Sequence, residues 1–135
     1  MSINPSKIHL IGAGGIGVSV VGKWFLHHGK TVSGSDVTSG EQVEALRHLG
    51  AHVALRQSVE NISEGLDLVI YSPAVPFENI ERARARELGI IEMSYPEFLG
   101  EFAKDFTTIA VSGTHGKSTT TAMIGSILEA AGMDP

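Results

Sequence analysis

Short runs of apolar residues along this chain are separated by longer segments in which apolar residues recur at helical spacing. Ile8, Leu10 and Ile11 predict a buried strand, and Ile16 to His28 predict an amphipathic helix. The alternation then continues: further strands are expected at 31–35, 52–55, 67–71, 90–93 and 107–111, and further helices at 41–49, 78–87, 96–104 and 122–131. Strands that alternate with helices predict an α/β fold built on a doubly wound parallel sheet.

The polar positions refine the ends and faces of these elements. Thr38 or Ser39 is expected to cap the second helix. Two prolines in the stretch SPAVP, at 72–76, predict a rigid loop rather than an immediate helix. The next helix reads ENIERARARE, and its alternating charges indicate a solvent-exposed surface with Ile80, Ala83 and Leu88 available for burial.

A glycine motif follows the first predicted strand. Gly12, Gly14 and Gly17 have the G-x-G-x-x-G spacing, which allows a tight turn, the close approach of a diphosphate and close packing of the next helix. The start of that helix would direct N–H groups and a positive dipole end toward an anion. Asp36 comes 19 residues after Gly17, at the end of the second strand, where a carboxylate can accept hydrogen bonds from a ribose. These features predict a Rossmann-like nucleotide site, although the same glycines could serve packing alone.

A second glycine loop, SGTHGKSTTT, lies between the last predicted strand and the last predicted helix. Gly113, Gly116, Lys117 and Ser118 predict a phosphate-binding loop, in which backbone N–H groups and the lysine hold phosphates and the hydroxyl can bind magnesium. The loop is shorter than a strict Walker A motif, because Val111 stands where that motif has its first glycine. It could otherwise be a simple turn that caps a helix.

Composition excludes several classes of function. The chain has 135 residues, 42% hydrophobic and 19% charged, as expected for about one globular domain. A net charge of −5 argues against non-specific nucleic-acid binding, and the absence of cysteine excludes disulfides and thiolate metal sites. No signal peptide or membrane-length apolar run is visible, so we expect a cytoplasmic protein that binds no membrane. The histidines His27, His28, His48 and His52 are expected at the surface, and no nucleophilic triad stands out.

Taken together, these motifs resemble the amino-terminal part of the Mur ligase family, over essentially the whole chain and in the same order. The residues that carry the resemblance are IGAGGIG at 11–17, VSGSD at 32–36, LGA at 49–51, SPAVP at 72–76, ARELGI at 85–90 and GTHGKSTTT at 113–121. Within the family, the match favours the branch that joins L-alanine to UDP-N-acetylmuramate. The resemblance implies a Rossmann-like UDP-sugar-binding domain at 1–105 and the start of an incomplete central ATP-binding domain at 106–135.

The resemblance also implies roles for individual residues. The UDP-sugar would be bound by Gly12, Gly14, Gly15, Ile16, Gly17, Asp36, Gln57, Ser72 and Ala74. In this set the glycine loop would face the diphosphate and Asp36 the uridine. ATP would be bound by Gly113, Thr114, His115, Gly116, Lys117, Ser118 and Thr119, with Ser118 as a ligand of Mg²⁺. His115 could donate to a phosphate but is expected to shape the loop rather than to catalyse. No NAD is expected.

Two departures from the family pattern affect these expectations. Gln57 stands where many members have a histidine that contacts the nucleotide base, although an amide could also form that hydrogen bond. The chain also stops at Pro135, before the remaining central strands and the third domain of the family. We therefore expect these 135 residues alone to be inactive, and their tail to be disordered, docked on the first domain, or exchanged between copies in a homo-oligomer.

Three functions remain open at this point. The first is the amino-terminal part of an ADP-forming ligase of peptidoglycan precursor synthesis, which forms an acyl phosphate before L-alanine attacks. The second is the NAD(P)-binding domain of an oxidoreductase, which Asp36 would permit but in which the second glycine loop has no purpose. The third is a non-catalytic nucleotide-binding module, which the short length favours. Binding of a UDP-sugar or of NADH would distinguish the first two.

Overall fold

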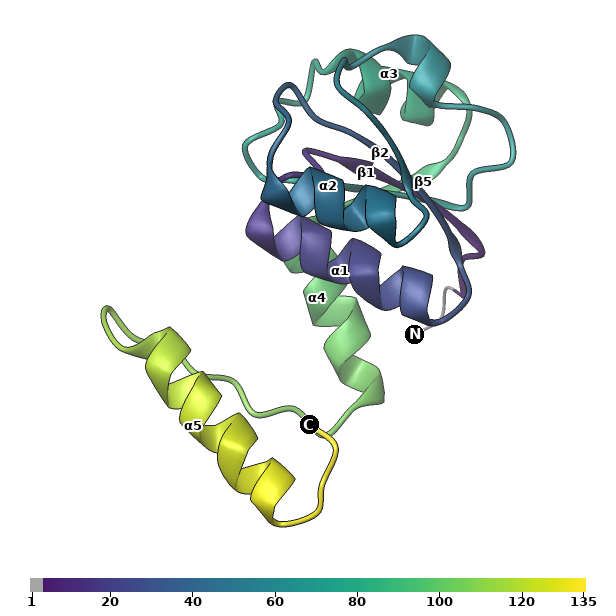
Figure 1. Cartoon of the computed structure of the whole chain (residues 1–135). Helices are drawn as coiled ribbons and strands as arrows, with labels where there is room; N and C mark the ends of the chain where they lie inside the picture. The colour runs from purple at the N-terminus through teal and green to yellow at the C-terminus, as the bar shows by residue number, and fades with distance from the viewer. Residues whose placement is uncertain (1–3) are drawn as a thin grey trace. The chain divides into compact units, whose positions relative to one another are not determined.

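The computed structural model describes residues 4–135, and its helices alternate with strands along residues 7–102 (Figure 1). The strands are β1 (Lys7–Ile11), β2 (Thr31–Ser35), β3 (His52–Ala54), β4 (Leu68–Tyr71) and β5 (Ile91–Ser94). The helices are α1 (Ile16–His27), α2 (Glu41–His48), α3 (Ile80–Glu87), α4 (Tyr95–Phe102) and α5 (Lys117–Ala130), with short 3₁₀ turns at Val59–Asn61 and Ala103–Asp105. Most predicted elements are therefore present within a residue or two of their expected bounds.

The five strands form one parallel sheet in the order β3-β2-β1-β4-β5. The chain starts in the centre, moves to one edge, and returns to the other side of β1, as in a doubly wound fold. The register places Ile8 beside both Val32 and Leu68, so β1 lies in the centre of the sheet and four of its five residues are buried. The predicted α/β class and parallel sheet are confirmed.

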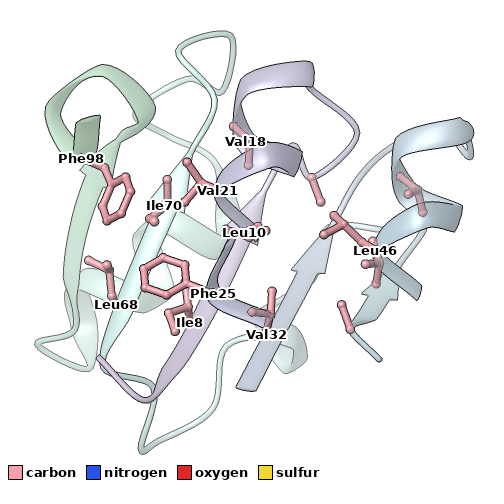
Figure 2. Close-up of a cluster of buried hydrophobic side chains, with 14 residues drawn as sticks. Ile8, Leu10, Val18, Val21, Phe25, Val32, Leu46, Leu68, Ile70 and Phe98 are labelled. Atoms are coloured by element: carbon pink, nitrogen blue, oxygen red, sulfur yellow. The ribbon is translucent and has the colours of Figure 1, made fainter. Parts of the chain in front are cut away.

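The sheet has helices on both faces, with α3 on one face and α1, α2 and α4 on the other (Figure 1). Because strand side chains alternate between faces, Leu10 and Ile70 point toward α1 and α4, while Ile11 and Val69 point toward α3. Figure 2 shows the larger cluster, in which the ring of Phe25 lies among strand side chains. Its labelled members are Ile8, Leu10, Val18, Val21, Phe25, Val32, Leu46, Leu68, Ile70 and Phe98.

The contacts within the chain fall into two units, residues 1–105 and residues 106–135. The second unit contains α5 and the segment before it. The predicted strand at 107–111 is wrong: these residues lie outside any helix or strand of the described chain. A β-strand exists only when another strand pairs with it, and the described sheet is built from residues 7–94.

Two expectations about helix ends and faces also need correction. The second helix, α2, begins after Gly40 without a side-chain cap, and Ser39 instead donates to the Glu44 carboxylate at 3.0 Å. The helix α3 is not a solvated surface element, because Glu81 and Arg82 are buried while Ile80 is 49% exposed. The ion pairs that allow this burial belong to the candidate site.

Candidate functional site

A cavity of about 330 Å³ lies at the carboxyl ends of the strands, where doubly wound sheets bind ligands. Its lining consists of Gly12, Gly15, Asp36, Val37, Gln57, Ser72, Ala74, Val75, Pro76 and Asn79. Each of β1 to β4 contributes residues that directly or closely follow its last residue. Six residues expected to bind the UDP-sugar are therefore brought together here, namely Gly12, Gly15, Asp36, Gln57, Ser72 and Ala74.

The first glycine loop is held against the end of β2 by backbone hydrogen bonds. The N–H groups of Gly12 and Ala13 both donate to the Ser35 carbonyl, at 2.9 and 3.0 Å, and Gly12 has a φ of 78°. That left-handed backbone is the reason a glycine is needed at this turn. The loop is thus a defined edge of the cavity.

The carboxylate of Asp36, which directly follows β2, is hydrogen-bonded to the glycine loop. One of its carboxylate oxygens, Oδ2, accepts the Gly14 N–H at 2.7 Å, and the other accepts the Thr38 N–H at 3.1 Å. Oδ1 also accepts from the Thr38 hydroxyl at 3.4 Å, but Oδ2 has a second lone pair, so the side chain can still accept from a ligand hydroxyl in the cavity. The predicted ribose or uridine contact remains a prediction.

Gly14, Ile16 and Gly17 lie outside the cavity lining. Ile16 is 78% exposed at the start of α1, and a Cβ on Gly17 would lie 2.5 Å from the Tyr95 ring. The third glycine of the motif therefore allows close packing of α1 on the start of α4. Backbone N–H groups in the first turn of a helix have no partners within the helix, so they suit an anion. Their contact with a diphosphate stays a prediction.

The loop after β4 forms the opposite side of the cavity. The Ser72 N–H donates to the Ile11 carbonyl at 3.0 Å, and the Val75 N–H donates to the Ser72 carbonyl at 2.8 Å. The guanidinium of Arg82 then donates to the Val75 carbonyl at 3.2 Å and lies over the Tyr71 ring at 3.6 Å. The two prolines correctly predicted a loop rather than an immediate helix, and Arg82 of α3 donates to it, as does Arg86 to the Phe77 carbonyl at 2.9 Å.

Asn79 is the polar lining residue that was not predicted from the sequence, and the apolar lining residues Val37, Val75 and Pro76 were not predicted either. Its Oδ1 accepts the N–H groups of Glu81 and Arg82, which caps α3, and its Nδ2 donates to Gln57 Oε1 at 2.6 Å. An asparagine just before a helical run is a strong capping signal, so its place at the start of α3 could have been predicted. Its contact with Gln57 joins residues 22 positions apart and could not.

The buried carboxylate of Glu81 on α3 has partners on other parts of the chain. Glu81 Oε2 accepts from Ser35 Oγ at 2.5 Å and lies 3.6 Å from His9 Nε2, while Oε1 accepts from Asn61 Nδ2 at 2.6 Å. Burial by itself would raise the pKa of Glu81, but hydrogen bonds from its neighbours outweigh it and hold that pKa below the usual value. The carboxylate is therefore retained as an anion in the core.

Arg82 and Arg86 share a single carboxylate on β5. Glu92 accepts from Arg82 at 3.1 and 3.2 Å and from Arg86 at 3.1 Å. Burial opposes ionisation of Glu92, but these two cations lower its pKa, and the same bonds raise the pKa of Arg82. Two arginines of a helix that was expected to be solvent-exposed therefore connect α3 to the sheet.

The second glycine loop lies in the second unit, and all seven of its predicted ATP-binding residues are exposed. Gly116 has a φ of 75° and directly precedes α5, while Lys117 Nζ donates back to the Gly113 carbonyl at 2.7 Å. A glycine turn that leads into a helix start, with a lysine and hydroxyls beside it, fits a phosphate-binding loop. The roles of Thr114, His115, Ser118 and Thr119 stay predictions.

The four histidines expected at the surface, His27, His28, His48 and His52, are exposed. His9 differs: it is 1% exposed, with its Nδ1 2.8 Å from Ser33 Oγ. Among residues 4–135, no three or more His, Cys, Asp or Glu side chains group in a way that could hold a metal ion. No described helix has the length and apolar character needed to cross a membrane.

Comparison with known proteins identifies the family. The family model described as "Mur ligase family, catalytic domain" matches residues 7–107, which is more than half of the chain. The chain belongs to the Mur ligase family. The resemblance inferred from the two glycine loops is thereby confirmed.

Two curated relatives that match the chain bear the same name. The UDP-N-acetylmuramate--L-alanine ligase of Clostridium kluyveri is 46% identical over 134 residues, which cover 98% of this chain and 29% of the relative. The ligase of the same name from Chlorobaculum tepidum is 44% identical over 137 aligned positions, covering 100% of this chain and 29% of the relative. The chain therefore spans about 29% of the length of these relatives.

Solved Mur ligase structures share the fold. The crystal structure of the UDP-N-acetylmuramate-alanine ligase MurC from Thermotoga maritima matches with a TM-score of 0.84 and 36% identity, over 93% of this chain and 29% of that one. The murein peptide ligase of Psychrobacter arcticus matches with a TM-score of 0.83 and 29% identity, over 94% and 27% of the two chains. The higher identity to the alanine ligase agrees with the branch indicated by the sequence motifs.

Proposed function

We propose that residues 1–105 bind the UDP part of UDP-N-acetylmuramate in the cavity at the carboxyl ends of β1 to β4. The observation that carries this proposal is the shape of the cavity lining, where a glycine turn, the Asp36 carboxylate and the 72–76 loop meet at the switch point of the sheet. Relatives named for UDP-N-acetylmuramate support this choice of ligand. The α1 N-terminus would receive the diphosphate and Asp36 the uridine.

We propose further that these residues belong to an ADP-forming ligase of peptidoglycan precursor synthesis, acting in the cytoplasm. In this reaction the lactyl carboxylate accepts the γ-phosphoryl group of ATP and ADP leaves. The amine of L-alanine then attacks the acyl carbon, the amide bond forms, and inorganic phosphate leaves as the nitrogen loses its proton. Lys117 and the backbone of 113–119 would hold the ATP phosphates, and Ser118 would bind Mg²⁺. We expect no turnover from these 135 residues alone.

Titration calorimetry tests the binding proposal directly. UDP-N-acetylmuramate, UDP, NADH and ATP are titrated separately into the 135-residue chain, and we expect heat of binding from the first two. Ala74→Trp, which places a large ring in the cavity, should abolish binding, whereas the same substitution at exposed Ala131 should leave it unchanged. If neither UDP-N-acetylmuramate nor UDP binds, the proposal is refuted.

A dinucleotide-binding function is the second candidate, because the glycine motif and Asp36 also fit NAD. The family comparisons do not favour it. NADH binding in the titration, without UDP binding, would establish it and overturn the ligand assignment made above.

A further inference from the structure

Asn79 and the first turn of α3 contact two segments at the cavity, residues 57–61 and residues 72–77. We propose that Asn79, Glu81 and Arg82 are positioning residues, which hold residues 57–61 and residues 72–77 in the geometry that binds the ligand. Residues 57–61 are called the first cavity wall below, and residues 72–77 the second cavity wall. The proposal rests on the function proposed above and adds a role for a helix that its charge pattern had assigned to the solvent-exposed surface.

Glu81 anchors the first cavity wall to the sheet. Its carboxylate is 0% exposed, and it accepts the Ser58 N–H at 3.1 Å and Asn61 Nδ2 at 2.6 Å, both from this wall. Its other oxygen accepts Ser35 Oγ at the end of β2. A buried carboxylate is tolerated only with such donors, so the wall and the strand are tied to one group. Moving the wall away would leave the charge without its partners.

Arg82 anchors the second cavity wall. Its guanidinium, in a residue only 7% exposed, donates to the Val75 carbonyl and stacks on the Tyr71 ring. Glu92 on β5 holds the same guanidinium through two hydrogen bonds. A planar guanidinium can make all of these contacts at once, which a lysine could not. The wall is therefore fixed relative to the edge of the sheet.

Asn79 links the two cavity walls through the helix itself. Its Oδ1 is occupied by the N–H groups of Glu81 and Arg82, so its Nδ2 is the atom directed to Gln57. Both Asn79 and Gln57 line the cavity. The amide orientation of Gln57 is thereby set by the start of α3, since Gln57 must present Oε1 to a donor.

Methionine substitutions test this role without opening large cavities. Glu81→Met and Arg82→Met retain most of the side-chain volume but remove the hydrogen bonds, while Glu87→Met and Arg84→Met make the same changes at an exposed pair on the same helix. Glu81→Gln should rescue binding. Its amide oxygen can still accept from the wall, and its NH₂ group can donate to Ser35 Oγ.

The first measurement is the affinity for UDP-N-acetylmuramate by calorimetry. We expect about a tenfold loss in Glu81→Met and Arg82→Met, and less than about a twofold change in Glu81→Gln and in both controls. Asn79→Ser is a milder variant, because serine also caps a helix but cannot donate to Gln57 from the same place. It should lose affinity while its free energy of unfolding stays unchanged. Wild-type affinity in Asn79→Ser and the two methionine variants would overturn the proposal.

The second measurement is hydrogen exchange in the unliganded chain, which does not depend on the ligand assignment. Amides of both cavity walls should exchange faster in the methionine variants than in wild type, while amides of β1 and β4 keep their protection. Equal acceleration in β1 and β4 would show general destabilisation and reject a positioning role. If the wild-type chain binds no UDP compound, the proposed function fails, and the exchange result alone then decides whether α3 positions the walls.

Discussion

At the scale of single residues, the glycines of the first loop serve different purposes. Gly12 adopts a left-handed turn at the cavity, whereas Gly17 has no such backbone requirement and instead makes room for the Tyr95 ring. The spacing of the motif was readable in the sequence. The partner of its third glycine was not, because Tyr95 is 78 residues away and meets α1 only through the order of the strands.

Gly17→Ala tests this packing role. The added methyl group would lie about 2.5 Å from the Tyr95 ring, so we expect the free energy of unfolding to fall by about 1–3 kcal/mol. Gly100→Ala is the control, because an added Cβ at this position in α4 would meet no atom within 4 Å and should raise the free energy of unfolding by about 0.5–1 kcal/mol. Urea unfolding measures both. Equal stability of Gly17→Ala and wild type would show that Tyr95 yields without cost.

Glu81 makes the stability of the fold depend on pH. Its pKa lies below the ordinary value of 4.5 because donated hydrogen bonds outweigh the effect of burial. Its ionised form therefore stabilises the fold fully above about pH 4.5, and this contribution is lost as the pH falls through the lower folded-state pKa. The groups around it are His9 on β1, Ser35 on β2, and Ser58 and Asn61 on the first cavity wall.

Urea unfolding of wild type and Glu81→Gln at a series of pH values checks this expectation. Wild type should be the more stable protein near pH 7, and its advantage should shrink as the pH is lowered below about 4.5. Since Glu92, Glu97 and Asp67 also have lowered pKa values, both proteins will lose stability in acid. The difference between them isolates Glu81, and a difference that does not vary with pH would contradict its assigned ionisation.

At the scale of elements, helix ends were predicted with mixed success. Pro96 lies in the first turn of α4, as predicted from the sequence, and Ser94 and Glu97 form a capping box there. For α2, Thr38 or Ser39 was the expected cap, although the helix begins after Gly40. Several small polar residues compete at that end, and the carboxylate of Asp36 takes the Thr38 N–H. Local sequence could not rank these alternatives.

Two serine substitutions compare a serine that caps a helix with a serine that does not. Ser94→Ala removes the side chain that accepts the Glu97 N–H, so we expect a loss of about 1 kcal/mol in the free energy of unfolding. Ser39→Ala should change it by less than about 0.5 kcal/mol, since Ser39 makes only an exposed contact with Glu44. Urea denaturation of both variants gives the comparison. A larger effect at Ser39 than at Ser94 would contradict the assigned caps.

The helix α3 shows where pattern reading fails for a physical reason. Alternating charges are typical of solvated helices, and ENIERARARE has no apolar stripe that would indicate burial. Its buried charges find partners on β1, β2 and β5, at sequence distances from 10 to 72 residues. The periodicity of a sequence describes the polarity along one helix or strand. It cannot predict hydrogen-bond or ion-pair partners that lie on other strands.

At the scale of the whole molecule, the parallel sheet was predictable because each strand had its own apolar run and each was followed by helical spacing. The cavity followed from the same reading, since the residues after successive parallel strands meet at one edge. The strand at 107–111 was wrong because its apolar pattern was read without a pairing partner. Membership of the family was recognised from the two glycine loops and their separation.

Limited proteolysis should expose the boundary between the two units. Residues 106–110 and 112–116 are exposed and lie outside any helix or strand, so trypsin should cut first after Lys104 or Lys117. Mass spectrometry should then show a resistant fragment that ends at one of these residues. A double Lys104→Gln, Lys117→Gln variant is the control and should lose these early cuts. An earlier cut at Arg56, or resistance of the whole chain, would contradict the expectation.

The central position of β1 has a consequence for synthesis on the ribosome. His9 on β1 pairs in register with Val69 on β4, and its side chain lies beside Glu81, whereas β2 pairs with β1 after only 24 residues. A nascent chain therefore carries an open apolar strand edge while the 60 residues that follow His9, up to Val69, are translated. At about 5–20 residues per second, this interval lasts about 3–12 seconds. During that time the side of β1 that will pair with β4 has unpaired backbone N–H and C=O groups, which other strands could pair with.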